Sequence, residues 1–420
     1  MASDEVIQEI QKRDGPTLEA TRPPLRRAAY SDRMAWQMAV LAQLAYVEFE
    51  TTPFKEISKL AKELAATNDV KAIEDRLRPL LHLFDRSASS DGSGVTGEQK
   101  LRMTLKACGF ELVGTFYNQS LDLLKNTEGF VATCDGPQGT YAVLAIRGTT
   151  SMQDWIRNVD AKPTPLPVPG GVPNDAEEPQ PNIHPGFHEA YKDAAAQMEA
   201  LLAKVASMPL FITGHSLGGA VAVISTWYLE RATLFQQTDR LAACYTFGAP
   251  RVGDHNFNKM FHTPIYRVVN SFDPVPMLPP SGPVTSTAKF VIRGLGRFLP
   301  GAIIFEKIAN FITDYQGYRH AGDLRYITAG REQSDGSFPD VQFFKTFGAY
   351  DRLLRMFSIV ERRLFRRPDQ YHDMTLYRRK LRYYSLKRMK AWDDFVAGRV
   401  QPTASAASQG SSGPLDQETP

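Results

Sequence analysis

Residues 208–226 read MPLFITGHSLGGAVAVIST: a short apolar run, then Gly-His-Ser-Leu-Gly, then small and apolar residues at helical spacing. No proline interrupts residues 210–226. This pattern predicts a strand, a sharp turn and a helix, with Ser216 at the tip of the turn and glycines where neighbouring chain must come close. A serine at that position is typical of a nucleophile whose hydroxyl points out of a sheet. An ordinary glycine-rich turn between a strand and a helix is the alternative.

Apolar runs on both sides of this stretch predict the strands of a mostly parallel sheet. The run at 141–146 is continuous, which is typical of a strand buried on both faces. A helix over 188–205 would return the chain to the strand before Ser216 by a right-handed crossover. The expected fold is therefore α/β, with helices on both faces of the sheet. The other predicted strands cover residues 109–116, 129–132, 210–213, 241–247, 265–270 and 324–328.

The ends of the chain differ from this central pattern. Residues 1–27 are polar and contain prolines, which favours a flexible N-terminal arm. Ser31 is a suitable N-cap for the helix that follows it, and residues 54–66 and 70–84 predict two more helices. We expect a main domain over 28–345, a basic helical extension over 346–400, and a disordered tail over 401–420.

Composition narrows the classes of protein to which the chain can belong. Hydrophobic residues make up 43% and charged residues 23%, as in soluble globular proteins. The first 20 residues have no apolar core of a signal peptide, and no run of 18 apolar residues occurs. We therefore expect a cytoplasmic protein, or one exported by a signal-independent route. Three scattered cysteines predict neither a disulfide framework nor a metal site.

The net charge of +3 hides a strongly basic segment. Residues 352–390 contain 13 lysines and arginines but three acidic residues. Such a run is usually a solvated helix face, although attraction to anionic lipid head groups is the functional alternative. No nucleic-acid-binding module accompanies it, so nucleic acid is not an expected partner. Residues 290–312 are apolar but broken by charges, and they would pack internally or form a cap that contacts lipid.

An acid and a histidine follow Ser216 in the chain. Asp273 comes just after the strand predicted at 265–270, where the carboxyl edge of an open α/β sheet holds its chemistry; a turn former before Pro274 is the alternative. His320, in Tyr-Arg-His-Ala-Gly, and His372, in Tyr-His-Asp, compete for the role of base. The order serine, acid, histidine is that of α/β-hydrolases.

Four stretches together resemble the class 3 lipase family, which includes fungal triacylglycerol lipases and plant phospholipases A1. They are AIRGTTSMQDW at 145–155, IHPGFHEAY at 183–191, FITGHSLGGAVA at 211–222, and YTFGAPRVGD at 245–254 with YRVVNSFDPVPMLPP at 266–280. The resemblance covers the core motifs between residues 140 and 328. It implies an α/β-hydrolase fold with extra helices at both termini.

The resemblance also implies roles for single residues. Ser216 would be the nucleophile, Asp273 the acid and His320 the base, because His320 fits the family's Tyr-x-His-x-Gly pattern. Thr149 and Leu217 would form the oxyanion hole. His184 and His215 belong to motifs as well, but packing and hydrogen bonding explain them.

This machinery implies hydrolysis of lipid acyl esters through an acyl-enzyme, with no metal and no organic cofactor. A phospholipase A1 acting on anionic membranes and an inactive lipase-like scaffold are the alternatives. The family's lid would fall at 151–160, and peripheral membrane contact would involve 290–312 and the basic C-terminal helices. Acyl-chain length, head group and oligomeric state stay open.

Overall fold

The computed structural model describes ten ranges of residues: 3–20, 29–47, 96–117, 127–136, 139–148, 162–167, 180–232, 240–279, 317–346 and 371–396. Several sequence-based expectations fall outside them. These are the helices at 54–66 and 70–84, the lid at 151–160, the apolar segment at 290–312 and the tail at 401–420.

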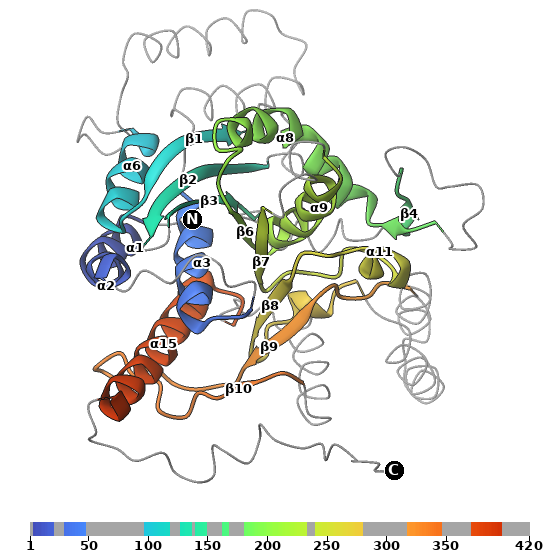
Figure 1. Ribbon diagram of the computed structural model, residues 1–420. Helices are drawn as coiled ribbons and strands as arrows, with labels where there is room; N and C mark the ends of the chain where they lie inside the picture. The colour runs from blue at the N-terminus through green and yellow to red at the C-terminus, as the bar shows by residue number, and fades with distance from the viewer. Residues whose placement is uncertain are drawn as a thin grey trace, which may run out of the picture.

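The centre of the molecule is an eight-stranded sheet in the order β1-β2-β3-β6-β7-β8-β9-β10 (Figure 1). Strands β3, β6, β7, β8 and β9 run parallel, while β1, β2 and β10 pair antiparallel at the two edges. The predicted mostly parallel sheet is confirmed. The strands are β1 Glu111–Tyr117, β2 Glu128–Gly136, β3 Gly139–Ile146, β6 Leu210–His215, β7 Leu241–Phe247, β8 Ile265–Asn270, β9 Asp323–Ile327 and β10 Phe343–Phe344; β4 Thr164–Pro165 and β5 Asn182–Ile183 form a separate pair.

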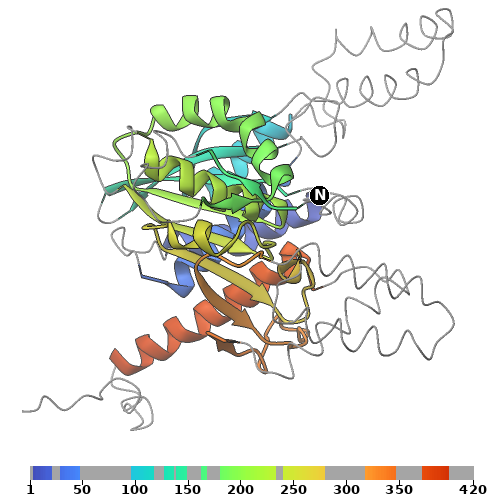
Figure 2. The ribbon, with the colours of Figure 1, turned by 90° about the vertical axis from the view of Figure 1, so that its right-hand side faces the viewer.

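Helices cover both faces of the sheet (Figures 1 and 2). The helices α8 (Pro185–Ala203) and α9 (Leu217–Arg231) share one apolar core, and α3 (Asp32–Leu44), α6 (Gly97–Ala107) and α15 (Met374–Val396) share the other. Strand β3 shows why both faces are needed. Tyr141, Val143 and Ala145 enter the α3 side, while Ala142, Leu144 and Ile146 enter the α8 side, because successive side chains of a strand point to opposite faces.

Local sequence signals explain where several helices begin. The Ser31 hydroxyl accepts the Met34 N–H at 3.5 Å, as predicted for an N-cap. Thr96 and Gln99 form a reciprocal capping box at α6, and Pro185 opens α8 at a position where its missing N–H costs nothing. No helix of the ten described ranges is both long and apolar enough to cross a membrane.

The expectation of a flexible N-terminal arm is wrong for residues 4–20. These residues form α1 (Asp4–Glu9), the π-helical turn η1 (Ile10–Asp14) and α2 (Gly15–Ala20). Ile10 and Asp14 are fully buried. Asp14 forms an ion pair with Arg378 of α15, and Glu9 Oε2 lies 2.8 Å from Nη2 of the same arginine. Long-range ion pairs that a local reading could not detect therefore order this segment.

The basic C-terminal helix is part of the main domain and not an appended extension. Tyr377 and Leu381 lie in the same core as α3. Its cations are largely used inside the protein: Arg379 pairs with Glu9 and Glu332, and Arg388 pairs with Asp32. The boundary expected at residue 345 therefore does not separate two units among the described residues.

The Asp14–Arg378 pair yields a stability prediction. Asp14→Ala is expected to lower the free energy of unfolding by about 3 kcal/mol, because it leaves a buried guanidinium with less compensation. Urea unfolding followed by circular dichroism measures this change. Glu98→Ala, which removes an exposed i,i+4 pair with Arg102, is the control and should cost under about 0.5 kcal/mol. Equal losses for the two variants would contradict the importance of the buried pair.

Candidate active site

Ser216 lies at the turn between β6 and α9, as the sequence predicts. Its backbone has φ 57° and ψ −127°, a left-handed conformation that a non-glycine residue adopts under strain. The Ser216 N–H donates to the Phe247 carbonyl at 2.9 Å. Glycines permit the close packing of this turn, because a Cβ on Gly214 would lie 2.2 Å from the Gly218 carbonyl oxygen. The turn has the geometry of a nucleophile elbow.

Asp273 is fully buried just beyond the carboxyl end of β8. Its Oδ1 accepts the Val275 N–H at 3.0 Å, and its Oδ2 accepts the Tyr377 hydroxyl at 2.5 Å. Both carboxylate oxygens also lie 2.9 Å from Nδ1 of His372. Three donors thus fix the plane of one carboxylate. An aspartate that only forms a turn before Pro274 would need the Val275 N–H but neither Tyr377 nor His372.

His372 is the histidine that meets Asp273. A carboxylate can only accept, so Nδ1 of His372 carries the proton and Nε2 is the acceptor nitrogen of the neutral ring. The ring packs 4.4 Å, between centroids, from the ring of His215, which precedes Ser216. A Cβ on Gly248 would lie 2.5 Å from Asp273 Oδ2 and 3.0 Å from His372 Nδ1. The pair therefore lies against the backbone that follows β7.

The structure brings His372, and not the expected His320, to Asp273. His320 Nε2 donates to the Pro276 carbonyl at 2.6 Å. Within the described ranges, the Asp273 carboxylate accepts hydrogen bonds from the His372 ring, the Tyr377 hydroxyl and the Val275 backbone N–H. His320 is not among these donors.

The position of each histidine along the chain gives the reason. His320 precedes β9, so it comes before the amino end of that strand, whereas the chemistry of an open α/β sheet lies beyond carboxyl ends. His372 comes after β9 and β10 and directly before α15, where Asp373 Oδ1 accepts the Thr375 N–H. The signal in the sequence that could have identified His372 is its position after the last predicted strand and directly before a helix.

His215 connects the serine turn to the histidine loop. Its Nε2 lies 2.8 Å from the His372 carbonyl oxygen and must donate, so its Nδ1 accepts the Tyr46 hydroxyl at 2.7 Å. Burial, and secondarily the neighbouring His372, lowers the pKa of His215 well below its usual value. A neutral ring with both nitrogens engaged is a structural link, which agrees with the expectation that packing and hydrogen bonding explain His215.

Tyr46 was missed by sequence reasoning. It is buried just after α3, and a Cβ on Gly148 would lie 2.4 Å from its hydroxyl oxygen. Tyr46 therefore lies between the serine turn and the end of the segment that leads to Thr149.

Thr149, which was expected to form the oxyanion hole, is outside the described residues. Its expected partner Leu217 is the first residue of α9, where helix N–H groups have no acceptor within the helix.

His184 has a packing role, as expected. It precedes α8 as the N-cap residue without a side-chain capping bond, and its ring stacks on Phe187 at 4.1 Å between centroids.

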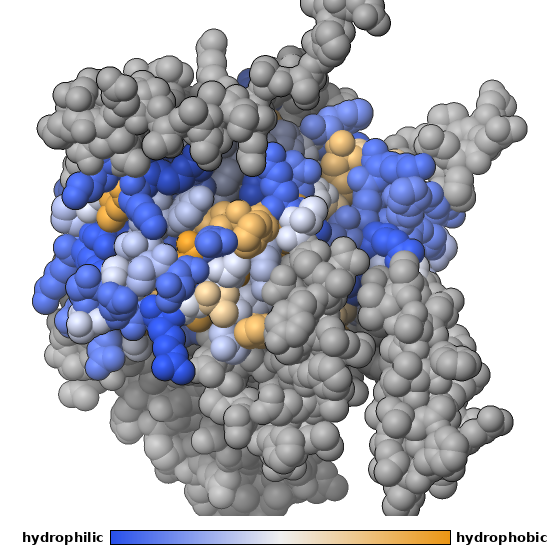
Figure 3. Space-filling view, turned by 90° about the horizontal axis from the view of Figure 1, so that it is seen from below, coloured by the Kyte–Doolittle hydropathy of each residue, from blue (hydrophilic) through white to orange (hydrophobic). Residues whose placement is uncertain are grey.

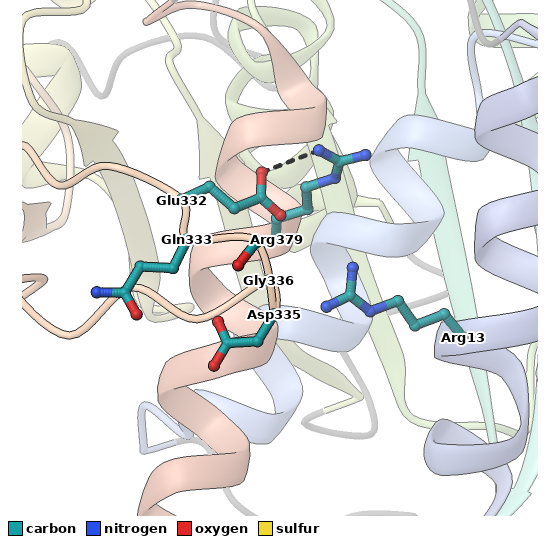
Figure 4. A pocket seen from close by; sticks show the side chains of 7 residues that line it. Arg13, Glu332, Gln333, Asp335, Gly336 and Arg379 are labelled. Atoms are coloured by element: carbon teal, nitrogen blue, oxygen red, sulfur yellow. Dashed lines mark hydrogen bonds and ion pairs between the residues drawn. The ribbon is translucent and has the colours of Figure 1, made fainter.

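A surface cleft between the loop at 332–336, η1 and α15 is distinct from this site (Figure 4). Arg379 and Glu332 on its wall pair at 2.9 Å, and its lining contains no histidine. The cleft is lined by Arg13, Glu332, Gln333, Ser334, Asp335, Gly336 and Arg379.

Comparison with known proteins finds similarity in the part of the chain that contains Ser216 and Asp273. Residues 143–282 match the family model described as Lipase (class 3). This match agrees with the resemblance to class 3 lipases across a third of the chain. The matched segment includes Ser216 and Asp273 but ends before both His320 and His372, so the match does not choose between the histidines.

Curated relatives come from fungi and plants. The chain is 35% identical over 146 residues to a secreted mono- and diacylglycerol lipase of Fusarium solani, covering 33% of this chain and 39% of the relative. It is 32% identical over 170 residues to a Rhizomucor miehei lipase (38% and 42%), and 29% identical over 171 residues to a chloroplastic phospholipase A1 of Arabidopsis thaliana (36% and 38%). The chain thus spans about two fifths of the length of these relatives.

Proposed function

We propose that this protein hydrolyses carboxylic esters of lipids, as class 3 lipases do, with Ser216 as nucleophile, His372 as base and Asp273 as the acid that orients the base. The observation that carries the proposal is the pairing of His372 Nδ1 with both oxygens of Asp273, while the His372 ring packs on His215, the residue before the strained turn at Ser216. A general base oriented by a third group is the arrangement that activates a hydroxyl nucleophile.

The mechanism follows from where charge develops. As the Ser216 hydroxyl attacks the ester carbonyl, His372 Nε2 takes its proton and the Asp273 carboxylate stabilises the resulting imidazolium. The N–H of Leu217, together with Thr149, would face the oxyanion of the tetrahedral intermediate. His372 then returns the proton to the leaving alcohol, and water releases the acyl group from Ser216 by the same steps in reverse order.

Among lipid substrates, we favour a triacylglycerol-type neutral ester. The basic C-terminal helix was the main reason to consider anionic membranes, yet Arg378, Arg379 and Arg388 pair with acidic residues of the protein. Large exposed hydrophobic side chains in the described ranges are limited to Met103 and Phe344. Figure 3 shows several small apolar groups among polar side chains on the coloured part of the face that it presents. Contact of residues 290–312 with lipid stays a prediction.

A substrate panel tests this function. Purified protein and its Ser216→Ala variant are incubated with triacylglycerol emulsions, with anionic phosphatidylglycerol vesicles and with a soluble short-chain ester, and fatty-acid release is titrated. We expect hydrolysis that Ser216→Ala abolishes, faster on the neutral emulsion. Preference for the anionic vesicles would favour a phospholipase A1. A folded protein without hydrolysis and without labelling of Ser216 by a fluorophosphonate would instead indicate a lipase-like scaffold.

A further inference from the structure

Lys380 is a fully buried lysine on the face of α15 that packs against the ends of β8 and β9. Its Nζ donates to Asn270 Oδ1 at 2.8 Å and to the Thr328 carbonyl at 2.9 Å. Across the described ranges, no carboxylate lies within ion-pair distance of this ammonium. Burial lowers the pKa of Lys380 to about 8. A buried cation that pairs with carbonyl groups alone costs desolvation energy, which favours a role beyond packing.

Asn270 occupies the centre of the network between Lys380 and the candidate triad. It is the last residue of β8 and is fully buried. Its backbone carbonyl accepts the Asp273 N–H at 2.9 Å, and its backbone N–H donates at 2.9 Å to Tyr377, whose hydroxyl donates to Asp273. Its side-chain Nδ2 donates to the Tyr371 carbonyl at 2.8 Å. One residue therefore contacts both the acid loop and the residue before His372.

The chemistry of Lys380 determines the orientation of the Asn270 amide. The two ends of an asparagine amide have nearly the same shape, so their hydrogen-bond partners decide which end points where. An ammonium is only a donor and the Tyr371 carbonyl is only an acceptor. Lys380 therefore holds Oδ1 toward itself and directs Nδ2 to Tyr371, one residue before the base.

We infer that Lys380 is a positioning residue of the proposed hydrolase, which acts through Asn270 to hold the histidine loop in register with Asp273. The inference rests on the proposed function. Neither residue touches substrate in this account. Their effect is on the geometry of the His372–Asp273 pair, and misplacement by about 1 Å is enough to slow catalysis about 100-fold.

A double-mutant cycle tests the inference. Lys380→Met keeps most of the side-chain volume but removes the donor, and Asn270→Ala removes the amide. On a soluble short-chain ester we expect Lys380→Met to lower kcat by about 10- to 100-fold with KM nearly unchanged. Because Lys380 acts through Asn270, the double variant should lose no more kcat than the less active of the two single variants. Lys387→Met, an exposed lysine on the same helix, should keep full kcat.

A second readout separates positioning from loss of folding. The far-downfield proton resonance of the His372 Nδ1–H in the NMR spectrum should weaken or shift in Lys380→Met but not in Lys387→Met, at a temperature where circular dichroism shows each variant folded. If Lys380→Met keeps wild-type kcat and this resonance, or if the single losses multiply in the double variant, the inference is overturned. Failure of the proposed function would differ, because the wild type itself would then show no hydrolysis that depends on Ser216.

Discussion

Replacing His372 with alanine is expected to lower kcat/KM by on the order of 10⁵-fold, because Ser216 would lose the group that accepts its proton. Residual hydrolysis would come from the oxyanion donors and substrate binding. Among the described residues, the neighbouring His215 cannot replace His372, since it uses both ring nitrogens in bonds to Tyr46 and to the His372 carbonyl. Hydrolysis of a soluble p-nitrophenyl ester measures the change.

His320→Ala is the matched control for this prediction. Its ring donates to the Pro276 carbonyl, a bond whose loss affects a loop but not the proton transfer. We expect kcat/KM to stay near the wild-type value. A severe loss in His320→Ala combined with an active His372→Ala would reverse the assignment.

Asp273→Asn is expected to lower kcat by on the order of 10⁴-fold while the protein stays folded. The site explains why an amide cannot replace this carboxylate. Three donors, from Val275, Tyr377 and His372, converge on two acceptor oxygens, whereas asparagine offers one oxygen and places an NH₂ against another donor. The ring would then favour the wrong tautomer, with its proton on Nε2.

Tyr377→Phe supplies the comparison for the acid. It removes one donor to Asp273 Oδ2 and the acceptor of the Asn270 N–H, but leaves the carboxylate and its contact with His372, so a loss of about 10-fold is expected. The same ester assay, with Tm recorded for each variant, separates the two effects. An Asp273→Asn variant as active as Tyr377→Phe would show that the carboxylate does not orient the base.

Much of the fold could be predicted because its signals are local. The strands at 241–247 and 265–270 have the bounds expected from their apolar runs, and the serine turn follows from glycines within five residues of each other. The N-cap at Ser31 is equally local. Such features depend on residues that are neighbours in the chain, so a single sequence contains them in full.

The choice of histidine and the state of the N-terminus depend on distant contacts. Asp273 and His372 are 99 residues apart, so no local signal shows that they meet. The motif around His320 matched a family pattern, although its position before the strand predicted at 324–328 already argued against it. Asp14 and Arg378 are separated by 364 residues. A polar, proline-containing segment reads as an arm until the buried arginine that pairs with it is known.

The crystal structure of a covalent phosphonate adduct, formed with a long-chain alkyl phosphonate ester, tests the central claim most directly. We predict phosphorus bonded to Ser216 Oγ, His372 Nε2 within about 3.2 Å of an oxygen of the adduct, and the phosphoryl oxygen facing the Leu217 N–H. An adduct on Ser216 with His320 in that position, or phosphonylation of another residue, would contradict it.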